Sequence, residues 1–178
     1  MSSPHTPSAA DDDRVPYAKP QPWGMAADMV VHDVQTEDER LWAPVAPGIW
    51  SRPLHLNVSG GFYVHLLKVK RSGLLQRHRH SGMVHAHVLR GKWLYLEHDW
   101  VAEEGSYVFE PPGETHTLVV PDDCQDMVTM FTVHGALMYV DTQGNATGYD
   151  DVFTRIEKYR AHFEAVGLGA DYVKNFMR

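Results

Sequence analysis

Strand-like segments separated by turn residues recur through the middle of the chain, and this spacing limits the fold more than any other feature. Between Ile49 and Val140 a new segment begins every eight to twelve residues. Such spacing is typical of a β-sandwich or β-barrel. The predicted strands cover residues 62–69, 74–80, 83–90, 93–97, 107–110, 117–120, 127–133 and 136–140. No long helical pattern interrupts them, so we expect an all-β fold.

The last part of the chain follows a helical period instead. Its apolar residues are four, three, four and three positions apart, which places them on one face of a helix. They are Val152, Ile156, Tyr159, Phe163 and Val166. Asp150 or Asp151 is suited to cap the start of this helix, and Gly167 to end it. A shorter turn over residues 171–177 is expected to follow.

These patterns divide the chain into three parts. We expect a disordered tail over residues 1–20, because this stretch is polar and contains several prolines. A barrel domain is expected over residues 21–148. A C-terminal helical segment over residues 149–178 is expected to pack on the barrel or on a partner subunit.

Composition narrows the class of protein further. The formal net charge of −7 argues against nucleic acid or an anionic membrane as a partner. The single cysteine, Cys124, excludes an internal disulfide framework. No apolar run approaches the ~20 residues that span a membrane, and the first residues lack the apolar core of a signal peptide. We therefore expect a cytoplasmic enzyme or binding protein.

Three histidines form a candidate metal site. His78 and His80 lie two positions apart on a predicted strand, where alternate residues share one face. His116 follows the turn formed by residues 111–115 and can complete a facial triad if its strand packs opposite. Neutral imidazole binds Zn, Cu, Ni and Fe, so the histidines alone do not identify the metal.

The residues around these histidines resemble the two motifs of the cupin superfamily. In the first segment Gly73 precedes His78 and His80, and in the second Gly105 precedes residues 111–113 and His116. The resemblance implies a small jelly-roll barrel, also called a double-stranded β-helix, with a metal at its centre. The sequence departs from the motifs in having one residue fewer after the first glycine. It also has Val120 in place of the final asparagine and Val84 in place of the usual glutamate ligand.

The missing glutamate leaves the number of protein ligands open. If Val84, Ala86 and Val88 face the barrel interior, then His85 points outward and the site has three protein ligands. A bulge that shifts the register would instead make His85 a fourth ligand. Glu97, on the next predicted strand, is another candidate for that position.

The whole chain resembles the 2,4'-dihydroxyacetophenone dioxygenases, which are cupins that cleave hydroxyketones. The resemblance runs through residues 22–25, 109–116 and 149–153. It implies Fe(II) as cofactor, an aromatic α-hydroxyketone and O2 as substrates, and 4-hydroxybenzoate and formate as products. His78, His80 and His116 would be the iron ligands, and Glu110 would lie behind them as a positioning or proton-accepting group. For Glu110, a solvated strand end remains the plain alternative.

Other functions stay open beside this one. A zinc-binding cupin sensor would use the same histidines without consuming oxygen, and a metal-dependent isomerase or decarboxylase would act without oxygen. Trp93 and Tyr95 are expected to serve in packing, although either could stack on an aromatic substrate. Arg77 and Arg79 are expected to point outward. Cupins of this size often pair through strands, so a homodimer or homotetramer is expected.

Overall fold

The computed structural model describes residues 15–178. Its contacts divide the chain into two units, residues 1–30 and residues 31–178. Within the first unit, residues 15–30 contain bends and turns but no helix or strand. The predicted tail over residues 1–20 falls mostly outside the described residues. All that follows concerns the second unit.

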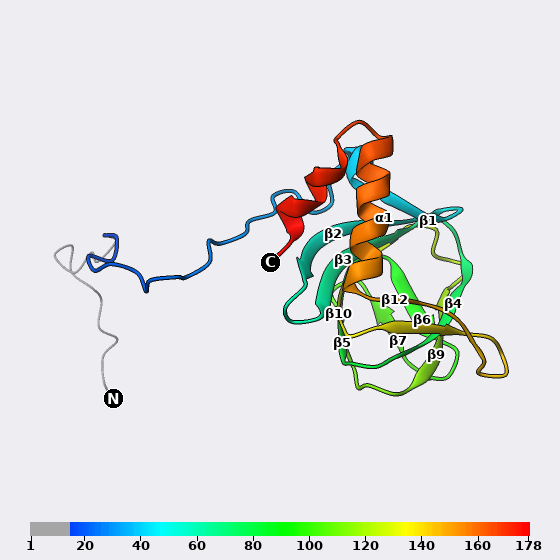
Figure 1. The fold of residues 1–178 in the computed structure, drawn as a ribbon. Coiled ribbons are helices and arrows are strands. Elements are labelled where there is room, and N and C mark those ends of the chain that lie inside the picture. Colours follow the sequence, from blue (N-terminus) through cyan, green and yellow to red (C-terminus); the bar gives the residue numbers. More distant parts are fainter. Residues whose placement is uncertain (1–14) are drawn as a thin grey trace, which may run out of the picture. The chain divides into compact units, whose positions relative to one another are not determined.

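Two six-stranded antiparallel sheets make up this unit (Figure 1). The first has, in spatial order, β1 (Ala43–Ala46), β2 (Ile49–Asn57), β3 (Phe62–Val69), β10 (Met127–His134), β5 (Val84–Arg90) and β8 (Tyr107–Glu110). The second has β12 (Ala146–Asp150), β11 (Leu137–Val140), β4 (Gly73–His80), β9 (Thr115–Val120), β6 (Lys92–Tyr95) and β7 (Val101–Glu103). Because β4 belongs to one sheet while β3 and β5 belong to the other, the chain winds between the sheets as a jelly roll does. The predicted all-β cupin fold is confirmed.

Most predicted strands begin and end within one or two residues of the observed ones, but four strands were not predicted. β1, β7 and β12 are short, and β2 contains Pro53. Proline lacks a backbone N–H and is tolerated only where no hydrogen-bonded neighbour needs one. β1 pairs only with the start of β2, as far as Ser51, and the register between β2 and β3 shifts beside Pro53. This irregular position accommodates the proline within a long strand.

The C-terminal helix is present as expected, with Asp151 as its cap. α1 (Val152–Ala165) begins with a capping box in which the Asp151 carboxylate accepts from the Thr154 backbone N–H and the Thr154 hydroxyl accepts from Asp151 N–H. Its buried face contacts β1, β2 and β12 of the same chain (Figure 1). The 3-10 helices η1 (Glu39–Leu41) and η2 (Ala170–Phe176) complete the elements.

The end of the chain is joined to the barrel by backbone hydrogen bonds. Arg178 N–H donates to the Leu56 carbonyl at 3.1 Å, and Val58 N–H donates to the Arg178 carbonyl at 3.0 Å. Met177 forms a parallel bridge with Leu56, beyond the stretch of β2 that β1 covers. The segment from α1 onward is therefore attached to its own barrel.

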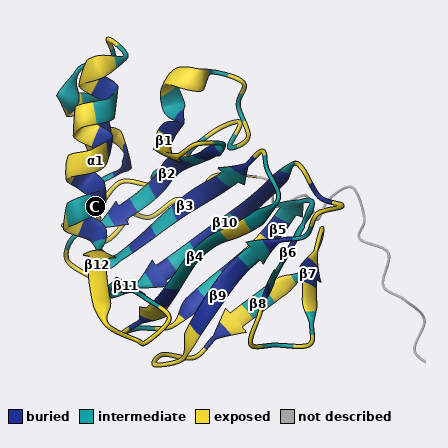
Figure 2. Cartoon of the chain, turned by 90° about the vertical axis from the view of Figure 1, so that its right-hand side faces the viewer, coloured by how far each residue is buried: buried dark blue, intermediate teal, exposed yellow. Residues whose placement is uncertain are grey.

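The core lies between the two sheets. Figure 2 shows buried residues concentrated along the strands, while the connecting turns and the outer face of α1 are exposed. On β5, Val84, Ala86 and Val88 are all buried, whereas His87 is exposed and His85 is only half-buried. Of the alternatives left open by the sequence, the one in which the aliphatic face of this strand points inward is observed.

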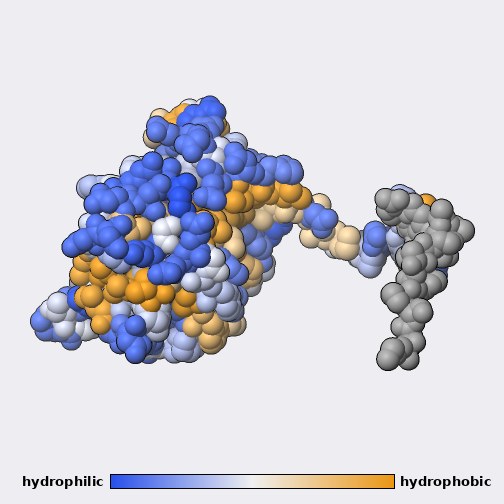
Figure 3. All heavy atoms as spheres, turned by 180° about the vertical axis from the view of Figure 1, so that it is seen from behind, coloured by the Kyte–Doolittle hydropathy of each residue, from blue (hydrophilic) through white to orange (hydrophobic). Residues whose placement is uncertain are grey.

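The outer surface is mixed in character. Figure 3 shows a face on which hydrophilic residues surround patches of hydrophobic ones. Large side chains exposed on the barrel include Leu96, Val101, Tyr107 and Phe109. No helix within residues 15–178 is long and apolar enough to cross a membrane.

Candidate metal centre and cavity

His78 and His80 both point into the barrel from β4. They are 4% and 0% exposed, whereas Arg79 between them is exposed, as the alternation of a strand requires. The His80 Nδ1 lies 2.7 Å from the Gly82 carbonyl oxygen. Because a carbonyl can only accept, Nδ1 carries a proton, so in the neutral imidazole the lone pair is on Nε2.

His116 lies on β9, directly opposite His78 in the antiparallel pair. Its side chain is 1% exposed, and its ring stacks on Tyr95 with centroids 3.8 Å apart and planes 5° from parallel. The rings of His78 and His80 lie 4.8 Å and 5.1 Å from it. The three predicted ligands are thus brought together inside the barrel by two neighbouring strands.

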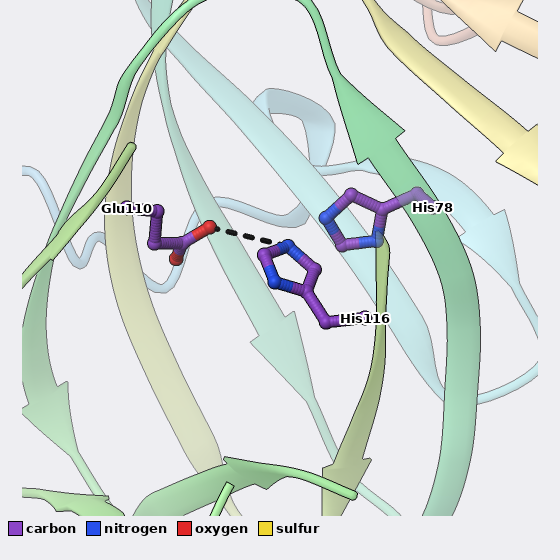
Figure 4. Close-up of side chains that lie close together, drawn as sticks. All are labelled: His78, Glu110 and His116. Atoms are coloured by element: carbon purple, nitrogen blue, oxygen red, sulfur yellow. Dashed lines mark ion pairs between the residues drawn. The ribbon is translucent and has the colours of Figure 1, made fainter. Parts of the chain in front are cut away.

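Glu110, at the end of β8, joins the same cluster. Its side chain is 4% exposed, so the alternative of a solvated strand end is wrong. The Oε2 atom lies 3.1 Å from His80 Nε2 and 3.4 Å from His116 Nε2, and the Tyr95 hydroxyl donates to Oε1 at 3.0 Å. Figure 4 shows Glu110, His78 and His116 facing one another.

Glu110 also lies next to the valine that stands at the glutamate position of the cupin motif. Val84 and Glu110 are direct cross-strand partners in the β5–β8 pair. Side chains of such a pair emerge on the same face, about 5 Å apart. A buried carboxylate therefore lies on the strand next to the one where the motif has its glutamate.

The polar atoms of this cluster fit a metal ion. Among the described residues, His78 Nδ1, His80 Nε2, His116 Nε2 and Glu110 Oε2 are buried and have no hydrogen-bond partner. Buried polar atoms without partners are costly and call for an explanation. At 3.1 Å, the Nε2 lone pair of a neutral His80 would face a carboxylate oxygen, and such a contact is favourable only with a proton or a metal cation between the two atoms. The ligand atoms of His78, Glu110 and His116 all lie within 4.8 Å of one another, so this cluster can hold a metal ion.

The electrostatics of the site favour neutral imidazoles at two positions. Burial, with the neighbouring His116 and His80, holds the pKa of His78 well below its ordinary value. Burial also lowers the pKa of His116, although the Glu110 carboxylate acts against it. For His80 burial acts in the same direction, but Glu110 and the Gly82 carbonyl outweigh it and raise the pKa. Neutral imidazole is the form that binds metals.

The two other candidates for a fourth ligand lie elsewhere. His85 is on the outer face of β5, where its Nδ1 lies 2.6 Å from the Tyr107 hydroxyl. The Glu97 carboxylate accepts from the backbone N–H and the hydroxyl of Thr117, at 2.7 Å and 2.8 Å. His98 and Glu114 can group with His116, but they approach it from the side opposite Glu110, near Nδ1. That His78, His80 and His116 bind the metal stays a prediction.

A cavity of about 650 Å³, including the part open to solvent, runs from this cluster through the barrel interior. Its walls are mostly aliphatic and aromatic side chains: Val45, Ala46, Ile49, Leu67, Leu75, Val84, Leu118, Phe131, Val133 and Leu137. His78, Tyr95 and Glu110 line it on the metal side, and His65 and Arg155 also line it. An apolar pocket with a few polar groups is the usual form of a site for a small organic molecule.

Comparison with known proteins identifies the family. The sequence model of the ChrR cupin-like domain matches residues 28–138. This chain is a cupin of that family. A crystal structure of an RmlC-like cupin protein from Ralstonia eutropha JMP134 is 31% identical, with a TM-score of 0.68, and the match covers 71% of this chain and 83% of that one.

More distant structures share the cupin fold. An acetylacetone dioxygenase from Acinetobacter johnsonii is 16% identical, with a TM-score of 0.67 over 83% of this chain and 99% of that one. A putative acetylacetone dioxygenase from Methylibium petroleiphilum PM1 is 14% identical, with a TM-score of 0.65 over 78% and 99%. At these identities the likeness establishes the fold alone. No curated protein matches the chain.

Two residues at the site of this cupin were not recognised from the sequence. Tyr95 was expected to serve in packing, yet its hydroxyl bonds Glu110 while its ring supports His116. Arg155 was not considered, although it lies three positions after Val152 and four before Tyr159, on the buried face of the helix. A charged residue within an apolar helical stripe was the available signal.

Proposed function

We propose that this cupin is a non-haem Fe(II)-dependent dioxygenase that cleaves a C–C bond of an aromatic α-hydroxyketone such as 2,4'-dihydroxyacetophenone. The observation that carries the proposal is the buried cluster of unpartnered ligand atoms opening onto an apolar cavity. The fold is shared with a protein named acetylacetone dioxygenase. This likeness supports the proposal that a barrel of this fold can house a dioxygenase site for a ketone.

In this proposal His78, His80 and His116 hold the metal, and Glu110 lies beside them. Bound there, Fe(II) would supply redox chemistry with O2 and a positive charge that favours ionisation of a chelating hydroxyketone. Glu110 would accept the hydroxyl proton of the substrate, since its Oε2 lies within 3.4 Å of two ligand atoms. Tyr95 holds the other carboxylate oxygen and fixes its orientation.

The cavity walls would position the substrate and exclude water from it. The bond broken would be the one between the carbonyl carbon and the hydroxymethyl carbon. One oxygen atom of O2 would enter each product, so that 2,4'-dihydroxyacetophenone and O2 yield 4-hydroxybenzoate and formate with all atoms balanced. Because both reactants would be bound in one site that excludes water, their reaction would be effectively unimolecular and therefore faster.

Oxygen uptake by the Fe(II)-loaded protein tests this function. The protein would be loaded anaerobically, mixed with 2,4'-dihydroxyacetophenone, and then exposed to O2 while oxygen and products are measured. We expect oxygen consumption matched by equal amounts of 4-hydroxybenzoate and formate. Stoichiometric iron with no oxygen uptake would contradict the proposal.

A metal sensor is the second candidate, because the matching family is described by the ChrR cupin-like domain. The same cluster would then hold Zn²⁺ without turnover. This function predicts tight zinc binding and no oxygen consumption with any ketone. The oxygen-uptake experiment, repeated with zinc-loaded protein as the control, separates the two.

A further inference from the structure

A second polar cluster lines the cavity that the metal cluster opens onto. Arg155, from α1, is 5% exposed, and His65, from β3, is 4% exposed. Both line the cavity. The Arg155 Nε is buried and has no hydrogen-bond partner in the part of the chain that the structure describes. An unpartnered guanidinium donor beside a cavity needs an acceptor, which a ligand can provide.

The charged groups around Arg155 leave a net positive charge. Asp150 Oδ2 lies 3.1 Å from Arg155 Nη2, and the same oxygen accepts from the Tyr139 hydroxyl at 2.7 Å. The other oxygen of Asp150 pairs with Lys158, whose side chain is 58% exposed. One carboxylate therefore faces two cations, and the other groups packed around Arg155 are uncharged hydroxyls and rings.

The neighbouring groups hold this end of the cavity in place. The Ser51 hydroxyl lies 2.9 Å from His65 Nδ1 and 2.5 Å from the Tyr159 hydroxyl. The Tyr63 ring lies under the Arg155 guanidinium, 5.4 Å from its carbon to the ring centroid. Strands and helix are thereby joined by polar contacts, and Arg155 has little freedom to leave the cavity wall.

The wall between the two clusters is mostly aliphatic, with Phe131 as an aromatic member and Gln76 as a polar one. His65 stacks on Phe131 at 5.9 Å, and Trp93, which does not line the cavity, lies 5.8 Å from Phe131 and 5.1 Å from Tyr95. Tyr95 in turn stacks on His116. A ligand bound between the clusters would meet polar groups at its two ends and rings or aliphatic chains along its middle.

We propose that Arg155 is a specificity-determining residue that binds the oxygen substituent at the far end of an aromatic ketone, such as a ring hydroxyl or phenolate. The inference rests on the proposed function, since the other end of the ligand is taken to occupy the metal cluster. The guanidinium donates to the ring oxygen, and the excess positive charge at this end favours an ionised ring hydroxyl. A ketone without the ring oxygen leaves this donor unpaired and binds less tightly.

Direct binding to the wild-type protein provides the first test. Affinities of 2,4'-dihydroxyacetophenone and of 2-hydroxyacetophenone, which lacks the ring hydroxyl, would be measured by calorimetry under anaerobic conditions with Zn²⁺-loaded protein. We expect the ring hydroxyl to tighten binding about tenfold or more. Equal affinities for the two ketones would overturn the proposal without any variant.

Two variants of Arg155 locate the effect. Arg155→Met should abolish the preference for the ring hydroxyl while leaving the affinity for 2-hydroxyacetophenone nearly unchanged. Arg155→Lys keeps a charge near Asp150 but lacks Nε, and should reduce the preference at least about threefold; it also serves if the methionine variant does not fold. Arg160→Met, on the exposed side of the same helix, is the matched control and should keep the full preference. An unchanged preference in the Arg155 variants would overturn the proposal.

The result is separable from that of the oxygen-uptake experiment. If no oxygen is consumed but the ring hydroxyl still tightens binding through Arg155, the proposed reaction fails and the binding role stands. If both ketones are cleaved with equal kcat/KM, the reaction stands and the role of Arg155 is overturned.

Discussion

The two ends of the cavity satisfy their polar groups to different extents, although Arg155 Nε at the helix end also lacks a partner among the described residues. At the metal end, ligand atoms of His78, His80, His116 and Glu110 face one another without hydrogen-bond partners among the described residues. At the helix end, Asp150 pairs with Arg155 and Lys158, and Ser51 joins His65 to Tyr159. Paired buried groups hold a fold together, whereas unpaired ones are a cost that a ligand can relieve. The comparison indicates that the metal end serves function and the helix end serves stability as well as recognition.

We expect the largest effect from removing one imidazole of the metal end. We expect His116→Ala to lose most bound metal and at least about 1,000-fold in turnover, because metal binding and catalysis share the site. The fold should persist, since the change removes the stacking on Tyr95 but no hydrogen bond within the described residues. Metal content by elemental analysis, oxygen uptake and circular dichroism check this.

His85→Ala is the matched control for that variant. His85 is on the outer face of β5 and bonds Tyr107, so its loss should leave metal content and turnover unchanged. Full metal retention in His116→Ala would remove this histidine from the ligand set.

At the helix end the expected effect is on stability instead. Asp150→Asn leaves Arg155 without its buried counter-ion, and breaking such a pair costs about 3 kcal/mol. We expect the free energy of unfolding to fall by that amount, with metal affinity nearly unchanged in the folded protein. Urea unfolding and metal titration measure the two quantities. A stable variant with weakened metal binding would reverse the comparison.

Glu110 sharpens the comparison, because it can act as ligand or as proton acceptor. Glu110→Gln keeps the size and the bond from Tyr95 but removes the charge and the basicity. We expect turnover to fall about 100-fold with metal content nearly retained, as for loss of a general base. Metal loss as severe as in His116→Ala would instead make Glu110 a ligand, and unchanged turnover would exclude both roles.

The smallest expected effect is a pH dependence at the helix end. Burial, with Arg155 acting in the same direction, holds the pKa of His65 well below its ordinary value of 6.5. Below pH 6.5 the unfolded chain binds a proton there that the folded protein does not, so this residue lowers stability as the pH falls.

His65→Asn removes that proton uptake. We therefore expect the wild-type protein to lose stability relative to the variant, by up to about 1.4 kcal/mol per pH unit, as the pH is lowered from near 6.5. Urea unfolding of both proteins across this range provides the measurement. A stability difference that does not change with pH would contradict the shifted pKa.

The sequence predicted the metal end far better than the helix end, for a physical reason. Alternation on one strand is a local rule, so the shared face of His78 and His80 followed from two positions alone. The side chain of Glu110 points into the barrel because Glu110 pairs with Val84. This pairing is set by the strand register and not by neighbouring residues in the sequence. Arg155 and His65 meet across a long stretch of sequence, and only the packing of α1 on the barrel brings them together.

The same distinction explains the errors in the fold. Strands with clear alternation were placed to within one or two residues, and Asp151 was one of two predicted caps. β2 was not predicted as one long strand, and Pro53 is tolerated in it because of where β1 stops and where the register with β3 shifts. Local sequence patterns therefore predict most strands and the helix. A residue that departs from these patterns, such as Pro53, is tolerated because of its pairing partners, which the sequence does not reveal.

The pairing of Val84 with Glu110 bears on how a barrel of this kind could be redesigned. Because the two Cβ positions share a face and stand side by side, a carboxyl group can be moved from one strand to the other while the backbone stays fixed. Exchanging the two residues would give the same composition with the acid delivered from β5, at a slightly different angle. The place of a buried carboxyl group in such a barrel is thus a point in space that two neighbouring strands can reach, and a motif that specifies one sequence position does not describe chains that reach it from the other strand.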